Sequence, residues 1–554
     1  MTRLNYKALL LVVITIGFSL RFAFIDDGLP FRYDVDEVHR MAIVMHMLSE
    51  KTLNPGWFGH PAQTVIYLLA LVIGIFYFIA NTFGAFSSPA DFAAWYHADP
   101  TVLFMMGRFI IILSSIALIA VTALIGRRVY NARVALLAGF ILAISPLHVY
   151  HSSLIRSSDI VMSLFMMLCL FFALKIYADK RSEIVQYPEF SWAVIRPYLL
   201  AGLFLGLAVT SKFYGVFAAS SIVAAHFMNK HSLKNSVMLL LLAMLASLFG
   251  AFISGPFMFL DFGTMIDDVF GEARETHLSA TAPGFWVDIL WFTQVLIKEG
   301  VGVVLFLFAV LGIALSCRAR RNELIILLVS PVLLITFLAA LSLRWDRWVL
   351  SLIPFLALFA AAFLDECFNK ISNFSTRPIR LAAYLAVLIL AIYSPANAAL
   401  TEIKDLEKPD ARDIAFKWIC DHVKSGSGIF VEMHGPQLDR NSYRIVKVGN
   451  DHRLRIIDSN SDGFNNVVPH GYYSNVSSLD DLSANGVDYV VLSSLEDRMK
   501  ASRFPGLYKK ELTKYQELFQ SSELLFDTSA IPYIRGPRIE VYKINVLHNR
   551  SSGS

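Results

Sequence analysis

The chain has 554 residues, of which 56% are hydrophobic and only 17% are charged, and its formal net charge is +4. This composition, with its positive mean hydropathy, excludes an ordinary soluble protein and indicates a polytopic α-helical membrane protein. Three of the four cysteines lie in or beside hydrophobic segments, so no disulfide framework is expected. No P-loop, GxGxxG or GxSxG motif occurs in a suitable context, so we expect neither nucleotide-driven chemistry nor a nucleic-acid partner.

The first apolar segment, residues 7–25, lacks a small-residue cleavage site and is expected to remain as a membrane span. The loop 26–60 follows, and Asp34 and Glu37 in it have the spacing of a helix capping box. An apolar stripe comes next, formed by Met41, Val44, Met45 and Leu48. The pattern predicts a short amphipathic helix that lies along the membrane surface.

Further apolar runs predict the remaining spans. They cover roughly 61–83, 101–126, 133–150, 160–177, 197–212, 214–229, 236–256, 285–316, 323–342, 347–366 and 380–399. The positive-inside rule places the clusters of Lys and Arg between them in the cytoplasm, together with the N-terminus. This requires that 61–83 does not cross completely, and that 285–316 divides into an interfacial piece, 285–298, and one span. The prediction is then about eleven spans.

The composition changes near residue 401, where short β-rich stretches begin to alternate with helical ones. We therefore expect a transmembrane domain over 1–400 and one α/β soluble domain over 401–548. The topology puts this second domain on the external, periplasmic side, together with the loop 26–60. Residues 549–554 are expected to be the remnant of a tag.

Two carboxylates stand out on the predicted external face. Asp36, with Glu37 beside it, is a candidate for catalysis, although a carboxylate at a helix start also simply complements the helix dipole. Asp159 precedes the span 160–177, where it could equally be an N-cap. If the two carboxylates act together, one could be a base while the other orients it or helps to hold a divalent cation. The need for that cation stays open, and no other cofactor is expected.

Basic side chains gather on the same face, where the positive-inside rule disfavours them. The main set is His60, Arg108, Arg156, Lys212, Arg344 and Arg347. Each alone could be an anchor that reaches for lipid headgroups. As a group they favour an anionic ligand, for which a phosphate is the natural candidate. Residues that could line the substrate cavity are His39 and Arg40, which share a helix face with Asp36, and also Arg156 and His277.

Five stretches, taken in chain order, resemble the protein O-mannosyltransferase family and its bacterial relatives, including the lipid A aminoarabinose transferase. They are DEVH at 36–39, LNPGWFGHPAQTVIYL at 53–68, SPLHVYHSSLIRSSDI at 145–160, GLFLGLAVTSKFYG at 202–215 and LRWDRWVLSLIPFLAL at 343–358. The similarity covers about residues 7–400. The chain departs from the family in having His60 where some relatives have lysine, and Trp348 where tyrosine is usual.

The resemblance implies a GT-C membrane glycosyltransferase of the inner membrane that takes a sugar from a polyprenyl-monophosphate donor. By the same resemblance, Asp36 would be the catalytic base and Asp159 its partner, while His60, Lys212 and Arg347 would lie near the donor phosphate. Transfer to an acceptor hydroxyl would invert the sugar carbon. The acceptor, a lipid, a glycan or a protein, stays open, because the polar domain does not resemble the sugar-binding repeats of eukaryotic protein mannosyltransferases.

Two alternatives belong to other classes of protein. A flippase or transporter of lipid-linked sugars would need ionisable groups spread through the spans and repeated halves, neither of which the sequence displays. A catalytically silent glycolipid-binding subunit would keep the cavity without the reaction. The carboxylate pair favours an enzyme over this last possibility.

Overall fold

The computed structural model describes residues 3–31, 33–59, 62–178, 191–229, 231–272, 284–341, 343–372, 376–448, 454–457, 476–502 and 504–545. The chain forms two compact units. The first comprises Met1–Asp26, Ile43–Asp267 and Pro283–Ile403, and the second comprises Asp27–Ala42, Asp268–Ala282 and Lys404–Ser554.

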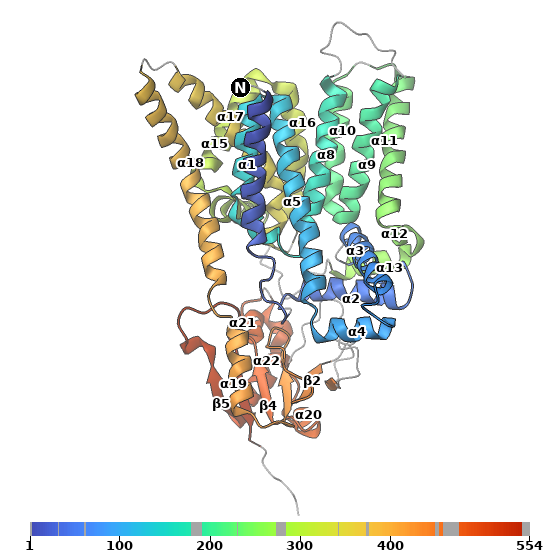
Figure 1. Cartoon of the computed structure of the whole chain (residues 1–554), viewed down its shortest axis with the longest axis vertical. Coiled ribbons are helices and arrows are strands. Elements are labelled where there is room, and N and C mark those ends of the chain that lie inside the picture. The colour runs from blue at the N-terminus through green and yellow to red at the C-terminus, as the bar shows by residue number, and fades with distance from the viewer. Residues whose placement is uncertain are drawn as a thin grey trace, which may run out of the picture. The chain divides into compact units, whose positions relative to one another are not determined.

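The first unit is built of long apolar helices, most of which run side by side (Figure 1). They are α1 (Arg3–Phe22), α3 (Gln63–Thr82), α5 (Thr101–Val129), α8 (Ser158–Ala178), α9 (Trp192–Ser211), α11 (Leu233–Ser254), α15 (Val303–Ala319), α16 (Arg321–Ala340), α17 (Ile353–Ser372) and α18 (Arg377–Leu406). Within the described ranges, nine helices are long and apolar enough to cross a membrane, or ten with one bent pair. This confirms the predicted polytopic α-helical membrane protein.

Shorter helices connect the long ones. They are α2 (Val35–Ser49), α4 (Pro89–Ala98), α6 (Ala132–Ala143), α7 (Pro146–His151), α10 (Ala219–Phe227), α12 (Phe257–Leu260), α13 (Phe262–Glu272), α14 (Phe285–Val295), the 3₁₀ helices η1 (Phe213–Ala218) and η3 (Asp346–Leu352), and the π-helix η2 (Leu296–Val301). The predicted spans 133–150 and 214–229 correspond to α6 and to η1 with α10. Both are shorter than the ~20 residues that a full crossing needs. The count of eleven spans therefore depends on these two short helices.

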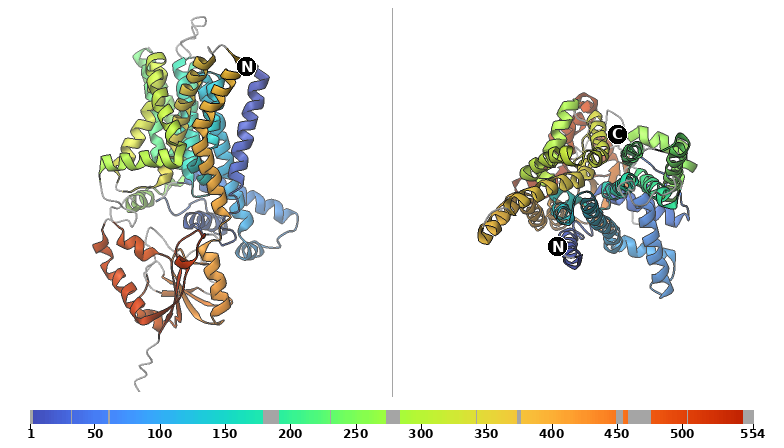
Figure 2. Two further views of the ribbon diagram at one scale, coloured as in Figure 1. Left: turned by 90° about the vertical axis from the view of Figure 1, so that its left-hand side faces the viewer. Right: turned by 90° about the horizontal axis from the view of Figure 1, so that it is seen from above.

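Two segments were predicted to depart from simple crossing. The run 285–316 does divide, because Phe285–Val301 and Val303–Ala319 meet at an angle of 110°. The break falls at Gly302, whose φ of +82° is a conformation that glycine adopts readily. The other segment, α3, runs across the direction of α5 rather than alongside it (Figures 1 and 2). It is long and apolar enough to cross a membrane, so the expectation that this segment does not cross completely stays a prediction.

The second unit contains a six-stranded sheet in the order β3-β2-β1-β4-β6-β5. The strands are β1 (Gly428–Val431), β2 (Arg444–Val448), β3 (Leu454–Ile457), β4 (Tyr489–Leu492), β5 (Ser522–Asp527) and β6 (Glu540–Ile544). The three central strands are parallel, since β1 pairs with β2 and β4 in that sense, and the outer pairings are antiparallel.

Helices cover both faces of this sheet. The helix α19 (Ala411–His422) packs on one face, against Ile429 and Val431 of β1. Phe430, which points to the opposite face, lies in the core formed with α20 (Leu479–Ala484), α21 (Leu495–Lys500) and α22 (Lys509–Ser521). This alternation along β1 is that of a strand buried on both sides. The α/β architecture predicted for the polar part of the chain is confirmed.

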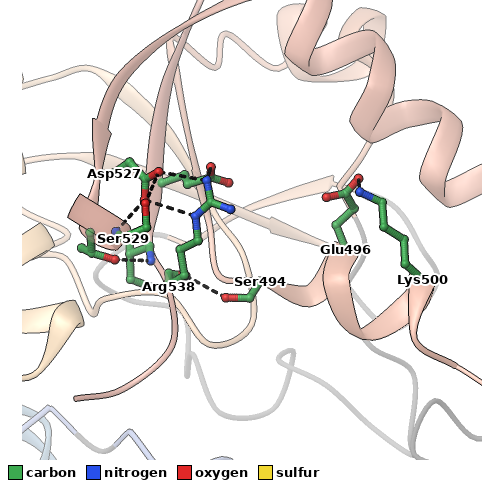
Figure 3. A network of polar contacts seen from close by, with 9 residues as sticks. Ser494, Glu496, Lys500, Asp527, Ser529 and Arg538 are labelled. Carbon is green, nitrogen blue, oxygen red and sulfur yellow. Dashed lines mark hydrogen bonds and ion pairs between the residues drawn. The ribbon is translucent and has the colours of Figure 1, made fainter. Parts of the chain in front are cut away.

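A polar network ties the outer strands β5 and β6 together (Figure 3). Asp527, at the end of β5, accepts hydrogen bonds from the guanidinium of Arg538 at 2.9 and 3.1 Å and from the backbone N–H and hydroxyl of Ser529 at 2.8 and 2.7 Å. Ser494 donates to the carbonyl of Arg538 at 3.1 Å. These bonds fix the connection between the last two strands.

Candidate functional site

Asp159 and Lys212, both predicted as site residues, are joined by hydrogen bonds in the first unit. Lys212 Nζ donates to the two carboxylate oxygens of Asp159 at 2.8 and 2.9 Å. The hydroxyl of Tyr214 donates to the same carboxylate at 2.5 Å. Both oxygens of Asp159 therefore accept hydrogen bonds, and the carboxylate in turn orients the side chain of Lys212.

The local chain path explains how Lys212 reaches this position. The helix α9 ends at Ser211, Lys212 has an extended backbone, and η1 begins directly after it. The turn back is tight, because a Cβ at Gly215 would come within 2.6 Å of the carbonyl oxygen of Ala208. Glycine at this point lets η1 fold against α9, so that Lys212 and Tyr214 can both face the start of α8.

A second cation, Arg347, lies in the same group. It is buried in η3, and its guanidinium is 5.1 Å from the centre of the Trp345 ring. Its charge acts on both Asp159 and Tyr214. The ring of Trp348 meets that of Tyr214 edge to face at 6.3 Å, which brings η3 against η1. The structure therefore brings together Asp159, Lys212 and Arg347, as the sequence predicted for one site.

A further polar contact extends this group toward α7. His151 Nε2 lies 3.3 Å from a carboxylate oxygen of Asp346, and the other oxygen accepts the backbone N–H of Arg347 at 2.7 Å. The charge of Arg156 acts on both His151 and Asp346. Asp346 was not predicted as a site residue, although it stands between two predicted arginines in the motif RWDR.

Sequence reasoning also missed Arg21, which is fully buried near the end of α1. Its guanidinium donates to Ser115 at 2.6 Å and to the carbonyl of Ala143 at 2.9 Å, and it lies 2.9 Å from Nδ1 of His148. These contacts join α1 to α5 and to α7. An arginine inside a predicted span is the available signal, because such a charge is costly in a membrane and needs partners.

Two other predicted phosphate-binding arginines have contacts elsewhere in the unit. Arg108 is buried and donates to the carbonyl of Ile25 at 3.1 Å. Arg344 forms a buried ion pair with Asp288, and its guanidinium lies 6.0 Å from the centre of the Trp291 ring. These contacts support structural roles for both. The predicted residues His60 and His277 lie outside the described residues.

The predicted catalytic carboxylate Asp36 belongs to the second unit, at the start of α2. Asp34 Oδ1 accepts the backbone N–H groups of Asp36 and Glu37, each at 3.1 Å. This is the N-cap expected of Asp34. Asp36 and His39 are half-buried, whereas Glu37 and Arg40 are buried.

The chain just before Asp36 is bound to the polar domain within the same unit. The hydroxyl of Tyr33 donates to Asp413, and the guanidinium of Arg412 lies over the Tyr33 ring at 3.7 Å. Burial and the bond to Asp413 raise the pKa of Tyr33, so its hydroxyl stays protonated. An ion pair of 2.6 Å between Asp27 and Arg535 adds to this attachment.

A metal site was left open by the sequence, with Asp36 and Asp159 as ligands if one exists. Among the described residues there is no group of three or more His, Cys, Asp or Glu side chains suited to a metal ion. Asp159 already accepts from Lys212 and Tyr214, so its donor set fits a cation poorly. We assign no step to a metal.

Known structures with the same arrangement of helices identify the fold. The chain aligns with the crystal structure of ArnT from Cupriavidus metallidurans in the apo state at a TM-score of 0.53 and 14% identity, covering 98% of both chains. The same enzyme bound to undecaprenyl phosphate aligns at 0.51, again with 14% identity and 98% of both chains covered. The oligosaccharyltransferase of Archaeoglobus fulgidus, tethered with an acceptor peptide, aligns at 0.53 and 13% identity over 97% of this chain and 74% of that one. The chain has the GT-C fold.

Part of the chain also matches a family model by sequence. Residues 60–262, which include Asp159 and Lys212, match the family model of dolichyl-phosphate-mannose-protein mannosyltransferases. No curated protein matches the chain by sequence. Over these residues the match agrees with the resemblance drawn from the motifs, and the fold of the chain is that of GT-C membrane glycosyltransferases.

Proposed function

We propose that this protein transfers a sugar from a polyprenyl-monophosphate donor to an acceptor hydroxyl, and that Lys212 and Arg347 bind the donor phosphate. The observation that carries the proposal is the group in which half-buried Lys212 is hydrogen-bonded to buried Asp159, with buried Arg347 near by. Lysine and arginine held beside a carboxylate in a membrane protein form a preorganised site for an anion.

The chemistry of the donor explains why such a site is needed. The acceptor oxygen forms a bond to C1 of the sugar while the bond from C1 to the phosphate oxygen breaks. The phosphate diester of the donor leaves as a monoester and gains negative charge. Fixed cations stabilise that charge as it develops, so no acid is required on the leaving group. Asp159 acts as a positioning residue here, because it holds Lys212 with both carboxylate oxygens.

We assign the role of general base to Asp36, which takes the proton of the acceptor hydroxyl as that oxygen attacks C1. A single displacement of this kind inverts the configuration of C1. The half-buried position of Asp36 at a capped helix start supports the assignment, since the cap fixes the backbone that carries the carboxylate. We also propose that this chemistry takes place on the periplasmic side of the inner membrane, with the N-terminus in the cytoplasm and the α/β domain outside.

Structural relatives support the choice of donor. ArnT from Cupriavidus metallidurans binds undecaprenyl phosphate in one of its crystal structures, and the family model is that of enzymes named for dolichyl-phosphate-mannose. Both molecules carry a polyprenyl-type chain and a phosphate. The acceptor class, whether lipid, glycan or protein, stays open, as does the identity of the sugar.

The test is to incubate the purified full-length protein with a panel of radiolabelled polyprenyl-phosphate sugars and to follow release of the free lipid phosphate. One donor is expected to react, and Asp36→Asn is expected to lower the rate by about 10²- to 10⁴-fold, the usual contribution of a general base. A matched control is Asp91→Asn, because Asp91 also lies in the first turn of a helix, α4. That variant is expected to react like the wild type.

Each outcome of this experiment decides one part of the proposal. Release that persists unchanged in Asp36→Asn would overturn the assignment of the base while leaving the donor class established. No release from any donor by the wild-type protein would overturn the proposed function.

A further inference from the structure

Residues 27–36, which lead into α2, are attached to the C-terminal α/β domain at several points. Asp27 pairs with Arg535 at 2.6 Å. The ring of Phe31 lies 5.5 Å from that of Phe416, on α19. All of these residues belong to one compact unit. The attachment points therefore include residues at both ends of the stretch that precedes the helix carrying Asp36.

Tyr33 is the last of these attachment points and has the most polar contacts. Its hydroxyl donates to Asp413, its ring lies 3.7 Å from the guanidinium of Arg412, and its carbonyl accepts from Arg412 at 3.4 Å. Arg412 is itself fixed, because two of its nitrogens donate to the two carboxylate oxygens of buried Asp410 at 2.7 Å. Tyr33 therefore meets a rigid surface on α19 rather than a mobile side chain.

Only two residues separate Tyr33 from Asp36, and one of them, Asp34, caps the helix. The oxygen of Asp34 that accepts the N–H of Asp36 is thus within one residue of the attachment. The backbone at Asp36 is consequently determined from both sides, by the cap and by Tyr33. Because so few residues lie between them, a change at Tyr33 should alter the position of the Asp36 carboxylate.

His434, in the α/β domain, lies within reach of the charges of Asp34 and Asp36. It follows β1 at the carboxyl end of the parallel strands, and its Nε2 lies 3.3 Å from Arg498. Burial, Arg498 and Arg412 lower the pKa of His434 to about 4, whereas the charges of Asp34 and Asp36 oppose that shift. His434 is therefore neutral near pH 7, and both aspartates are close enough to act on it.

We propose that the C-terminal α/β domain positions the catalytic carboxylate, with Tyr33 as the positioning residue that joins α19 to Asp36. This inference rests on the proposed function, because it takes Asp36 as the base. The domain is then part of the catalytic machinery.

The physical requirement behind this role is geometric. A general base must come within about 2.6–3.2 Å of the proton that it removes, and a displacement of about 1 Å can lower the rate by about 100-fold. Loss of the Tyr33 attachment should therefore lower kcat. The KM for the donor should change little, because donor binding is assigned to Lys212 and Arg347 in the other unit.

The experiment measures kcat and KM for the reactive donor in Tyr33→Phe, Tyr33→Ala and Asp413→Ala, all in the full chain. Tyr33→Phe keeps the ring that Arg412 covers and loses only the hydroxyl, so a fall of about 3- to 10-fold in kcat is expected. Tyr33→Ala loses both the ring and the hydroxyl, and its kcat should fall by about 10- to 100-fold. The double variant Tyr33→Phe/Asp413→Ala should resemble the more affected single variant, because the two changes remove one shared hydrogen bond.

A matched control is Tyr443→Phe. The hydroxyl of Tyr443 also bonds to α19, through the carbonyl of Ile419 at 3.3 Å, but Tyr443 lies in the sheet core and not at the attachment. It should keep the wild-type kcat. Binding of the product, polyprenyl phosphate, should be unchanged in every variant, which separates misplacement of Asp36 from unfolding.

The outcomes distinguish this inference from the proposed function. An active wild-type protein whose Tyr33→Ala and Asp413→Ala variants keep full kcat would overturn the positioning role alone. Equal losses in Tyr443→Phe and Tyr33→Phe would do the same, since they would indicate a general effect of domain stability. A wild-type protein that releases no lipid phosphate would instead overturn the proposed function.

Discussion

Lys212 Nζ lies 2.8 Å from one carboxylate oxygen of Asp159 and 2.9 Å from the other, and Asp159 has almost no exposed surface. A buried pair of this kind adds little net stability over an apolar pair, but removal of one partner leaves an uncompensated charge. Substitutions in this pair should therefore have two separable effects, one on stability and one on sugar transfer.

Lys212→Met should lower stability strongly, by about 3 kcal/mol, because the Asp159 carboxylate stays buried without its main partner. The double variant Lys212→Met/Asp159→Asn should regain most of that loss, since it removes both charges. Neither variant should transfer sugar at a measurable rate, because the lysine assigned to the donor phosphate is absent in both. Thermal unfolding in detergent and lipid-phosphate release measure the two effects. Wild-type turnover by the double variant would contradict the role given to Lys212.

Asp34→Ala should loosen the start of α2. The variant loses the oxygen that accepts from the N–H groups of Asp36 and Glu37, which costs about 1 kcal/mol for a typical N-cap. Hydrogen exchange at the amides of residues 36 and 37 should become faster, and kcat should fall. Asp34→Ser supplies another capping oxygen and should retain most of the protection. Equal exchange rates in wild type and Asp34→Ala would show that the cap does not stabilise this turn.

Gly312→Ala should destabilise the helix bundle. A Cβ at Gly312 would overlap the carbonyl oxygen of Phe359, so α15 and α17 would have to separate. Overpacking of this kind costs about 1–3 kcal/mol. Gly263→Ala is the matched control, because a Cβ there meets no atom within 4 Å, and alanine favours a helix over glycine. The measurement is the melting temperature of the two variants in the same detergent; similar values would contradict the close packing.

Glu432→Gln should change how the stability of the protein depends on pH. Glu432 is fully buried and accepts hydrogen bonds from the backbone N–H of Ser493 at 2.6 Å and from the hydroxyl of Tyr515. Burial raises the pKa of Glu432 above its ordinary value of 4.5. The unfolded state thus loses its proton at a lower pH than the folded state does. The contribution of Glu432 to stability is therefore fully present below its ordinary pKa and is lost as the pH rises toward the folded value.

Glutamine cannot ionise, so the variant should lack this loss. Relative to wild type, Glu432→Gln should be more stable at about pH 8 than at about pH 5. Thermal unfolding of both proteins at the two pH values measures the difference. If the two proteins differ in stability by the same amount at both pH values, Glu432 does not titrate in that pH range.

The sequence predicted the elements whose formation depends on neighbouring residues. Apolar runs identified α5, α8 and the other long helices, and the β-rich stretches after residue 401 include the strands β1 and β2. The cap at Asp34 was visible because Asp34 and Glu37 stand three residues apart. Even the division of 285–316 was predicted, although the bend occurs at Gly302 rather than at the charged residues before it.

The contacts that build the candidate site join residues far apart in the chain, and only the tertiary structure decided them. Asp159 and Lys212 are 53 positions apart, and Tyr33 and Asp413 are 380 apart. Arg21 carries no local sign of its partners on α5 and α7. Hydrophobic periodicity reports which side of a helix is apolar, because it depends on spacing within one turn or two. The choice of partner for a buried charge depends instead on which helices pack together, and on the requirement that each polar group taken out of water finds an opposite one.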